Sequence, residues 1–411
     1  MSKARRIWKI GLLSAVCAGL VVWLADTIAR GGWEISGLVY AGQAAQGRTE
    51  ARTVTIERSP VRMIKDSYPS FSAVAINADA NMLVVTDENL FQILEYDRRE
   101  NTPPQARFTE PKRIISGPNT RAEMMCGVYI DPVTKEVYVL NNDTQNWLPV
   151  FPRDARGNAT PSRYLAAPHG TFGISVNEEK QEMFMTVQHQ NSVVVYRKQA
   201  SGDEKPLRTI AGSDTQLEDP HGIALDIKNK LIFVSNFGNA QVSPPGSRGG
   251  RRAADTYGKF EPPSITVYPL DASGNVKPLW IIEGPKTMLN WPSQMALHEA
   301  RQELFVANDA DDSILAFRAS DKGDAAPIRM IKGPNTGIKN PPGIALDVKN
   351  GEISVASMGI HAVLFFPVTA DGDVKPSRII RGGPANQAAL NIGNPGAVGY
   401  DTKRDQILVP N

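Results

Sequence analysis

The sequence predicts an all-β protein, a seven-bladed β-propeller preceded by one N-terminal hydrophobic helix. Three observations predict it: a repeated first-strand motif, a repeated fourth-strand motif, and an incomplete unit at each end of the chain. The 34 glycines and 30 prolines among 411 residues indicate many turns and short elements, which favours β structure. The predicted domains are a signal anchor or signal peptide over 1–30, a linker over 31–52, and the propeller over 53–411.

The N-terminal segment has the pattern of a membrane-targeting sequence. An apolar run from Ile10 to Ala25 follows the cations Lys3, Arg5, Arg6 and Lys9, which predicts an inside N-terminus and a translocated body. The run is short for a spanning helix, so an uncleaved anchor and a cleavable signal peptide both remain open, although bulky residues at its end favour the anchor. We expect a single-pass cell-membrane protein with its propeller on the periplasmic or extracellular side, or a secreted or periplasmic protein after cleavage.

Two strand motifs recur along the body. A short apolar strand that mostly ends in Asp or Asn occurs seven times, at 72–77, 127–131, 173–177, 222–226, 294–298, 343–347 and 397–401. A fourth-strand pattern, P-x-R-x-I-x-G in its fullest form, also occurs seven times, beginning at Pro60, Pro111, Pro161, Pro206, Pro278, Pro327 and Pro376. Second and third strands lie between the two motifs, so each unit reads as one antiparallel four-stranded blade.

The two chain ends each carry half of such a unit. The strands predicted at 397–401 and 407–411 have no third or fourth strand after them, and those at 53–57 and 60–65 have no first or second strand before them. Pairing of the two halves would complete one blade and leave no exposed sheet edge. The sequence therefore predicts a closing seventh blade that is shared between the N-terminal and C-terminal strands.

Several strands resemble those of known repeat propellers. PHGIALD (220–226) and PPGIALD (341–347) resemble the opening strand of NHL repeats, and FVSN (233–236), FVAN (305–308) and YVLN (138–141) resemble the YVTN strand. The resemblance covers nearly all of residues 53–411 and implies propeller architecture. These families include lactonase-like, lyase-like and purely binding members, so the resemblance implies no single activity and carries over no catalytic residue.

Two features of the sequence are candidate binding sites. His221 is the only imidazole among the residues that enter the predicted inner strands, where it could ligate a metal, move a proton, or only pack in its turn; the other four histidines show no short-range pairing. An insertion over 239–263 separates Asn236 from the next strand and is rich in Gly, Pro and Arg, which suits an anionic surface, a partner protein, or a solvated loop. The predicted binding residues are His221, Asn236, Arg248, Arg251, Arg252, Tyr257 and Lys259.

The polar residues that end the second strands are candidate metal ligands. Hard cations such as calcium take carboxylate and amide oxygens, and the resemblance to lactonase-like propellers implies calcium in the channel. The alternative is that these residues satisfy loop backbone groups. The candidates are Asp87, Asn141, Asn236 and Asn308. No catalytic residue and no obligatory cofactor is predicted, and calcium stays possible.

The predicted function is binding rather than catalysis. A formal net charge of +2 does not favour nucleic acid as a partner. We expect a membrane-tethered extracytoplasmic module that binds or scaffolds a protein partner through its top face or its insertion. The alternative is a metal-dependent lactonase, hydrolase or lyase, of calcium type, with its site at the mouth of the central channel.

Overall fold

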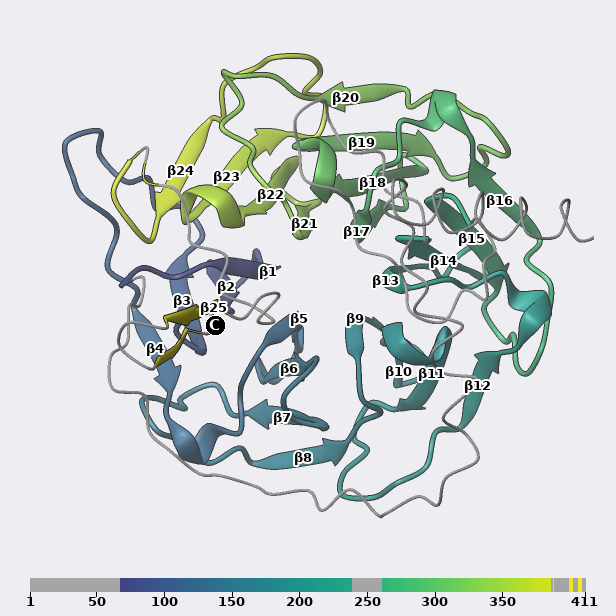
Figure 1. Ribbon diagram of the computed structural model, residues 1–411, viewed down its shortest axis with the longest axis horizontal. Coiled ribbons are helices and arrows are strands. Elements are labelled where there is room, and N and C mark those ends of the chain that lie inside the picture. The colour runs from purple at the N-terminus through teal and green to yellow at the C-terminus, as the bar shows by residue number, and fades with distance from the viewer. Residues whose placement is uncertain (1–66, 239–260, 386, 388–398, 402–405, 409–411) are drawn as a thin grey trace, which may run out of the picture. The chain divides into compact units, whose positions relative to one another are not determined.

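The chain forms six four-stranded antiparallel sheets arranged as a ring (Figure 1). The computed structural model describes residues 67–238, 261–385, 387, 399–401 and 406–408, all of which belong to one compact unit, residues 65–411. Within each sheet the strands are neighbours in chain order. Each sheet is one blade, and we number the blades one to six along the chain.

Blades one to three contain twelve strands, which are β1 (Phe71–Asn77), β2 (Met82–Asp87), β3 (Gln92–Asp97), β4 (Arg113–Ser116), β5 (Met125–Ile130), β6 (Val137–Asn141), β7 (Trp147–Phe151), β8 (Arg163–Ala166), β9 (Thr171–Asn177), β10 (Glu182–Val187), β11 (Ser192–Arg197) and β12 (Arg208–Ala211). Blades four to six contain β13 (Pro220–Asp226), β14 (Leu231–Asn236), β15 (Ser264–Pro269), β16 (Trp280–Glu283), β17 (Pro292–His298), β18 (Glu303–Asn308), β19 (Ser313–Arg318), β20 (Arg329–Ile331), β21 (Gly343–Asp347), β22 (Glu352–Ser357), β23 (Ala362–Pro367) and β24 (Arg378–Arg381). The repeated motifs of the sequence therefore correspond to real first and fourth strands in these six blades.

Apolar side chains fill the spaces between neighbouring blades. Phe233 of blade four packs in one buried cluster with Leu304 and Val306 of blade five. Middle strands such as β14 and β18 are buried along almost their whole length, because a propeller blade is covered on both faces. This explains why the second strands read as continuous apolar runs rather than as an alternating pattern.

Glycines in the first strands permit the close approach of the blades around the channel. A Cβ atom on Gly127, Gly173 or Gly222 would overlap a backbone carbonyl oxygen of the next blade. The first strands lie nearest the centre of the ring in Figure 1. The Gly that opens the repeated G-I-A-L-D type motif is therefore a packing requirement between blades.

The outer strands are also linked from blade to blade. In blades one to five, an apolar residue of the fourth strand forms a parallel bridge with a glycine in the turn between the third and fourth strands of the next blade. The pairs are Ile115 with Gly157, Leu165 with Gly202, Ile210 with Gly274, Ile282 with Gly323, and Ile331 with Gly372. These bridges form a belt around the rim, from blade one to blade six.

The ring closes directly between blade six and blade one, so the predicted seventh blade is wrong. Gly343 of β21 lies against the Ser72 carbonyl oxygen of β1, as the inner glycines of other blades lie against their neighbours. Thr102 N, in the turn between β3 and β4, donates to Ile379 O of β24 at 2.7 Å and continues the rim belt. Phe71 shares a buried cluster with Val363 and Phe365. The described ring has six blades.

The strand pair at the C-terminus does not complete a blade. β25 (Gly399–Asp401) and β26 (Gln406–Leu408) pair with each other and form a separate two-stranded sheet among the described residues. The half blade predicted at 53–65 lies outside the described residues. Because blades one and six already bury each other's faces, no gap remains for a blade shared between the termini.

Helical structure in the described residues is limited to short 3-10 turns, such as η2 (Gln188–Gln190). The segment for which the N-terminal helix was predicted, residues 1–30, lies outside the described residues, as does the linker over 31–52. In the described part of the chain no helix has the length and apolarity that crossing a membrane requires.

Candidate functional site

The two faces of the ring differ in their loops. We call the face with the loops between second and third strands, and with the loops that enter the first strands, the top face. On the opposite face, five of the six turns between first and second strands contain four residues. On the top face, residues 237–263 separate β14 from β15, where blades one, three, five and six have four residues. The longest of these loops therefore lies on the top face.

His221 is buried in a stack of aromatic rings. Its side chain is on β13, and its ring stacks on Phe237 with centroids 3.3 Å apart and packs against Phe172 at 4.1 Å. Phe237 in turn stacks on Trp291 at 5.1 Å. His221 Nδ1 lies 2.8 Å from the Asp219 carbonyl oxygen. This geometry gives His221 a packing role, and no other His, Cys, Asp or Glu of the described chain joins it in a group of potential metal ligands.

The strand-ending candidates for calcium use their polar atoms within their own blades. Asp87 accepts from Ser70 N at 2.7 Å and from Asn89 N at 2.9 Å. The amide oxygens of the other three accept a backbone N–H from the loop that enters the first strand: Asn141 from Glu123, Asn236 from Glu218, and Asn308 from Asn290. Their geometry matches the interpretation as loop caps.

Five of the predicted binding residues, Arg248, Arg251, Arg252, Tyr257 and Lys259, lie outside the described residues. The structure does describe the base of their insertion. Gly238 has φ of 68° and lies so close to Glu261 and Pro262 that a Cβ atom would overlap both backbones. Asn236 belongs to β14 at the same base. The insertion therefore leaves and re-enters the top face at one point, beside the His221 stack.

Acidic residues in the loops after the second strands, among them Glu88, Asp143 and Asp309, kept a calcium site possible in the sequence, and the structure places Glu88 against the thiol of Cys126. Glu88 follows β2, and its Oε1 accepts from Cys126 Sγ at 3.4 Å. Burial, together with the nearby carboxylates of Asp309, Asp87 and Asp143, raises the pKa of Glu88 to about 7, although the hydrogen bond from Cys126 acts in the opposite direction. Burial and the charge of Asp312 also raise the pKa of Asp309 to about 7. Glu88 and Asp309 lie more than 200 residues apart in the sequence, so no motif joined these two residues.

A side chain from one inner strand reaches across the ring to another inner strand. Gln294 Nε2 on β17 of blade five donates to Cys126 O on β5 of blade two at 2.5 Å. Blades two and five lie on opposite sides of the ring in Figure 1. This bond therefore links inner strands from opposite sides of the ring.

The raised pKa of Glu88 predicts a pH-dependent stability. The folded-state pKa of about 7 exceeds the ordinary value of 4.5, so Glu88 favours folding below pH 4.5 and loses that contribution as pH rises towards 7. Glu88→Gln is therefore expected to stabilise the protein at pH 8 on the order of 1–3 kcal/mol and to have little effect at pH 4.5. Urea unfolding at both pH values measures this, and the exposed Glu179→Gln serves as the control. An equal effect of Glu88→Gln at both pH values would contradict the assignment.

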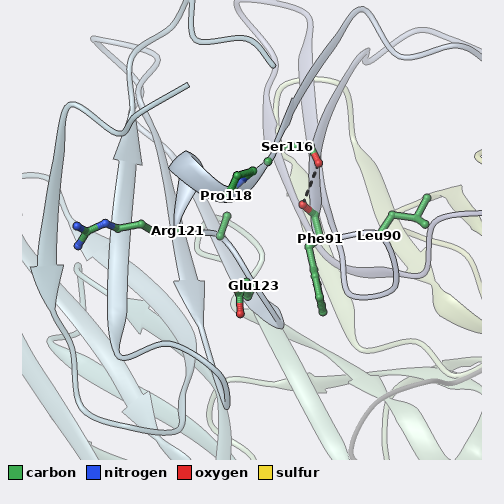
Figure 2. A pocket seen from close by; sticks show the side chains of 8 residues that line it. Leu90, Phe91, Ser116, Pro118, Arg121 and Glu123 are labelled. Atoms are coloured by element: carbon green, nitrogen blue, oxygen red, sulfur yellow. Dashed lines mark hydrogen bonds between the residues drawn. The ribbon is translucent and has the colours of Figure 1, made fainter. Parts of the chain in front are cut away.

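A shallow pocket lies on the top face between blades one and two (Figure 2). Its volume is about 230 Å³, and its lining includes Leu90, Ser116, Pro118, Arg121 and Glu123. The Arg121 guanidinium lies over the Tyr164 ring, 4.4 Å from its centroid. Small-molecule sites usually have at least about 300 Å³. This pocket is better suited to receiving one side chain of a partner than to enclosing a substrate.

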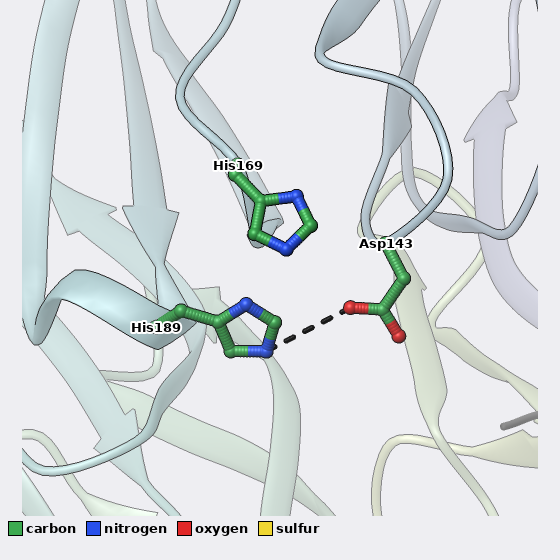
Figure 3. A group of neighbouring side chains, drawn as sticks. All are labelled: Asp143, His169 and His189. Atoms are coloured by element: carbon green, nitrogen blue, oxygen red, sulfur yellow. Dashed lines mark ion pairs between the residues drawn. The ribbon is translucent and has the colours of Figure 1, made fainter. Parts of the chain in front are cut away.

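Three top-face loops bring Asp143, His169 and His189 together (Figure 3). One ligand atom of each side chain lies within 4.8 Å of the others, and His189 Nε2 is 3.7 Å from Asp143 Oδ1. The sequence analysis regarded these histidines as unpaired because they lie 20 residues apart in different loops. The sequence did contain one indication of this group, because Asp143 and His189 hold the same repeat position. Each is the second residue after the second strand of its blade.

Comparisons with known proteins establish the fold class and no more. A crystal structure of a functionally unknown protein from Desulfotomaculum acetoxidans DSM 771 matches with a TM-score of 0.50 and 14% sequence identity, over 78% of this chain and 90% of that one. The likeness and the six blades define a β-propeller. No family model matches the chain. A search of curated proteins likewise finds no match.

Proposed function

We propose that this β-propeller is a non-enzymatic binding module that holds a protein partner on its top face. One observation carries the proposal: a single top-face loop is expanded to residues 237–263, while the corresponding loops of the other blades have four or five residues. A propeller fold does not need this expansion, and long loops in compact folds commonly carry function. Its sequence offers Arg248, Arg251, Arg252, Tyr257 and Lys259, the cationic and aromatic types suited to a protein interface.

We further propose that the N-terminal hydrophobic segment tethers the propeller outside the cytoplasm. The supporting observation is the cation-flanked apolar run from Ile10 to Ala25. The resemblance of the strand motifs to NHL and YVTN repeats supports the binding function proposed above, because those families include purely binding members. The tether would keep the propeller at the membrane.

Removal of residues 239–260 is expected to abolish partner capture without unfolding the ring. Gly238 and Glu261 are already in contact, so a short Gly-Ser link can rejoin them with little strain. The full-length parent and the deletion variant should be crosslinked in native membranes, purified in mild detergent, and compared by quantitative mass spectrometry. A Val348→Ser variant is the control, since Val348 is 52% exposed in a turn of the opposite face. Equal recovery of the same partner by the parent and the deletion variant would show that the insertion does not bind the partner.

The second candidate is a hydrolase, lactonase or lyase at the channel mouth. The observation in its favour is the Glu88 carboxyl, whose pKa of about 7 suits general acid–base catalysis at neutral pH. Such an enzyme would lose its activity on a lactone or ester in the Glu88→Gln variant. The local capping bonds of Asp87, Asn141 and Asn308 do not support a calcium ion shared between blades.

A further inference from the structure

We propose that Asp143, His169 and His189 form a binding site for one divalent transition metal ion of the zinc class, at the junction of blades two and three. Asp143 lies in the loop between β6 and β7 of blade two, and His169 lies in the loop that leads from β8 into β9. His189 is part of η2 in blade three. Figure 3 shows the three side chains converging from these three loops. The site goes beyond the binding function proposed above and does not depend on it.

The donor atoms are close to the spacing that a metal requires. Tetrahedral ligands at 2.0–2.1 Å from zinc lie about 3.3–3.5 Å apart. His189 Nε2 and Asp143 Oδ1 are 3.7 Å apart, and all three donors lie within 4.8 Å of one another. Both histidines are exposed, so small ring rotations can bring the donors together. Two imidazoles and one carboxylate suit zinc, cobalt or iron(II) far better than calcium.

Backbone hydrogen bonds fix the three loops relative to one another. Gly170 N donates to Asn142 O at 3.0 Å, and Gln188 N donates to Gly170 O at 2.7 Å. The residues in these two bonds, Asn142, Gly170 and Gln188, are each the immediate neighbour of one ligand. The Asn142 side chain adds a bond from Nδ2 to Thr171 O at 3.1 Å. The ligands are therefore positioned by the folded ring before any ion binds.

A neighbouring amide orients His169. Asn146 Oδ1 lies 3.1 Å from His169 Nδ1, the ring nitrogen that points away from the cluster in Figure 3. When Nδ1 donates its proton to that oxygen, Nε2 carries the lone pair that a metal accepts. Such partners behind a ligating histidine are typical of metal sites. Asn146 is therefore a positioning residue for this site.

Comparison with the other blades shows that folding does not require these side chains. The second residue after the second strand, which is Asp143 or His189 in blades two and three, is Asn89, Gly238, Ala310 and Gly359 in the others. Gly170 occupies a left-handed position at which other blades carry Met124, Asp219, Trp291 and Asn340. A Cβ atom on Gly170 would lie 2.9 Å from the His189 ring. Blade three therefore lacks a side chain where the imidazole needs the space.

Metal binding by the full-length chain tests the site. The chain has five histidines, and His221, His298 and His361 are buried, so an exposed imidazole site has to use His169 and His189. The protein should carry a non-histidine affinity tag. We expect one equivalent of Co²⁺ to give visible d–d absorption, one equivalent of Zn²⁺ to displace it, and Zn²⁺ to raise the melting temperature. Ca²⁺ at the same concentration should neither displace Co²⁺ nor raise the melting temperature.

Variants assign the ligands. His169→Ala, His189→Ala and the isosteric Asp143→Asn are each expected to weaken Zn²⁺ binding about 100-fold or more, and Asn146→Ala about tenfold. The matched control is Gln190→Ala, an exposed neighbour of His189 on η2, which should bind like the parent. Circular dichroism shows whether each variant is folded. If a variant does not fold, the Co²⁺ spectrum of the parent protein still tests whether the site binds metal. Absence of that spectrum, a calcium response without a zinc response, or parent-like affinity in both histidine variants would overturn the assignment.

Discussion

Replacement of Arg98 by alanine is expected to lower the free energy of unfolding by about 3–5 kcal/mol, because it leaves a buried carboxylate without its partner. Arg98 follows β3 of blade one, and its Nη1 lies 3.0 Å from Asp347 Oδ2 at the end of β21 in blade six. The Asp347 side chain is fully buried and the Arg98 side chain is 10% exposed. Arg98 also lies 3.3 Å from Glu352. The pair therefore joins the first and last blades.

The neighbouring Arg99 is a matched control for this prediction. Its side chain is 66% exposed and pairs with Asp97 at 3.0 Å within the same blade. Arg99→Ala should therefore cost less than about 1 kcal/mol. Denaturant unfolding of the full-length variants in mild detergent measures both values. Similar losses of unfolding free energy for the two variants would contradict a stabilising role of Arg98 at the junction between blades six and one.

The same kind of ion pair recurs between blades two and three, which supports direct contact between blades six and one. Lys198 of blade three lies 2.6 Å from Asp131 Oδ2 at the end of the first strand in blade two, as Arg98 of blade one does for Asp347 of blade six. Blade six thus contacts blade one in the way that blade two contacts blade three. A further blade at the closure would separate Arg98 from Asp347.

Strand motifs could be predicted from the sequence, whereas the partner of each strand could not. The GIALD segment at 222–226 is the body of β13, and ILV near the C-terminus overlaps β26. A strand pattern records which face is buried and where turns occur, but not which edge the strand joins. The contacts that decide closure include Thr102, in a turn without the glycine found in the other blades. Repeat counting therefore predicted one blade too many.

The candidate site was predicted less well for a related reason. His221, the histidine that the sequence singled out, lies in an aromatic stack. His169 and His189 become a candidate metal site only because the fold brings their loops together. Residues at one repeat position in adjacent blades lie side by side in a propeller. Comparison of Asp143 with His189 at their shared position could have found the group. The acids Glu88 and Asp309 belong to blades one and five, which a search for short-range motifs does not connect.

Phe237→Ala is expected to lower the free energy of unfolding by about 3–5 kcal/mol, as is typical when a buried aromatic ring is removed. Phe237 is 6% exposed and is the first residue after β14, at the base of the 237–263 loop. Its ring lies between His221, at 3.3 Å and an interplanar angle of 3°, and Trp291, at 5.1 Å and 12°. Loss of the ring removes both stacking contacts and leaves a cavity between blades four and five.

Phe237→Leu separates the packing role of the ring from its stacking role. Leucine keeps most of the apolar volume, so its cost should be about 1–2 kcal/mol, mainly from the lost ring contacts. Because the stack supports the base of the insertion, Phe237→Ala should also reduce partner capture at a temperature where it stays folded, while Phe237→Leu should largely retain capture. If Phe237→Ala is destabilised as expected and still captures the partner like the parent, the binding surface does not depend on this part of the top face. A stability loss below about 1 kcal/mol would instead show that the stack contributes little to packing between these blades.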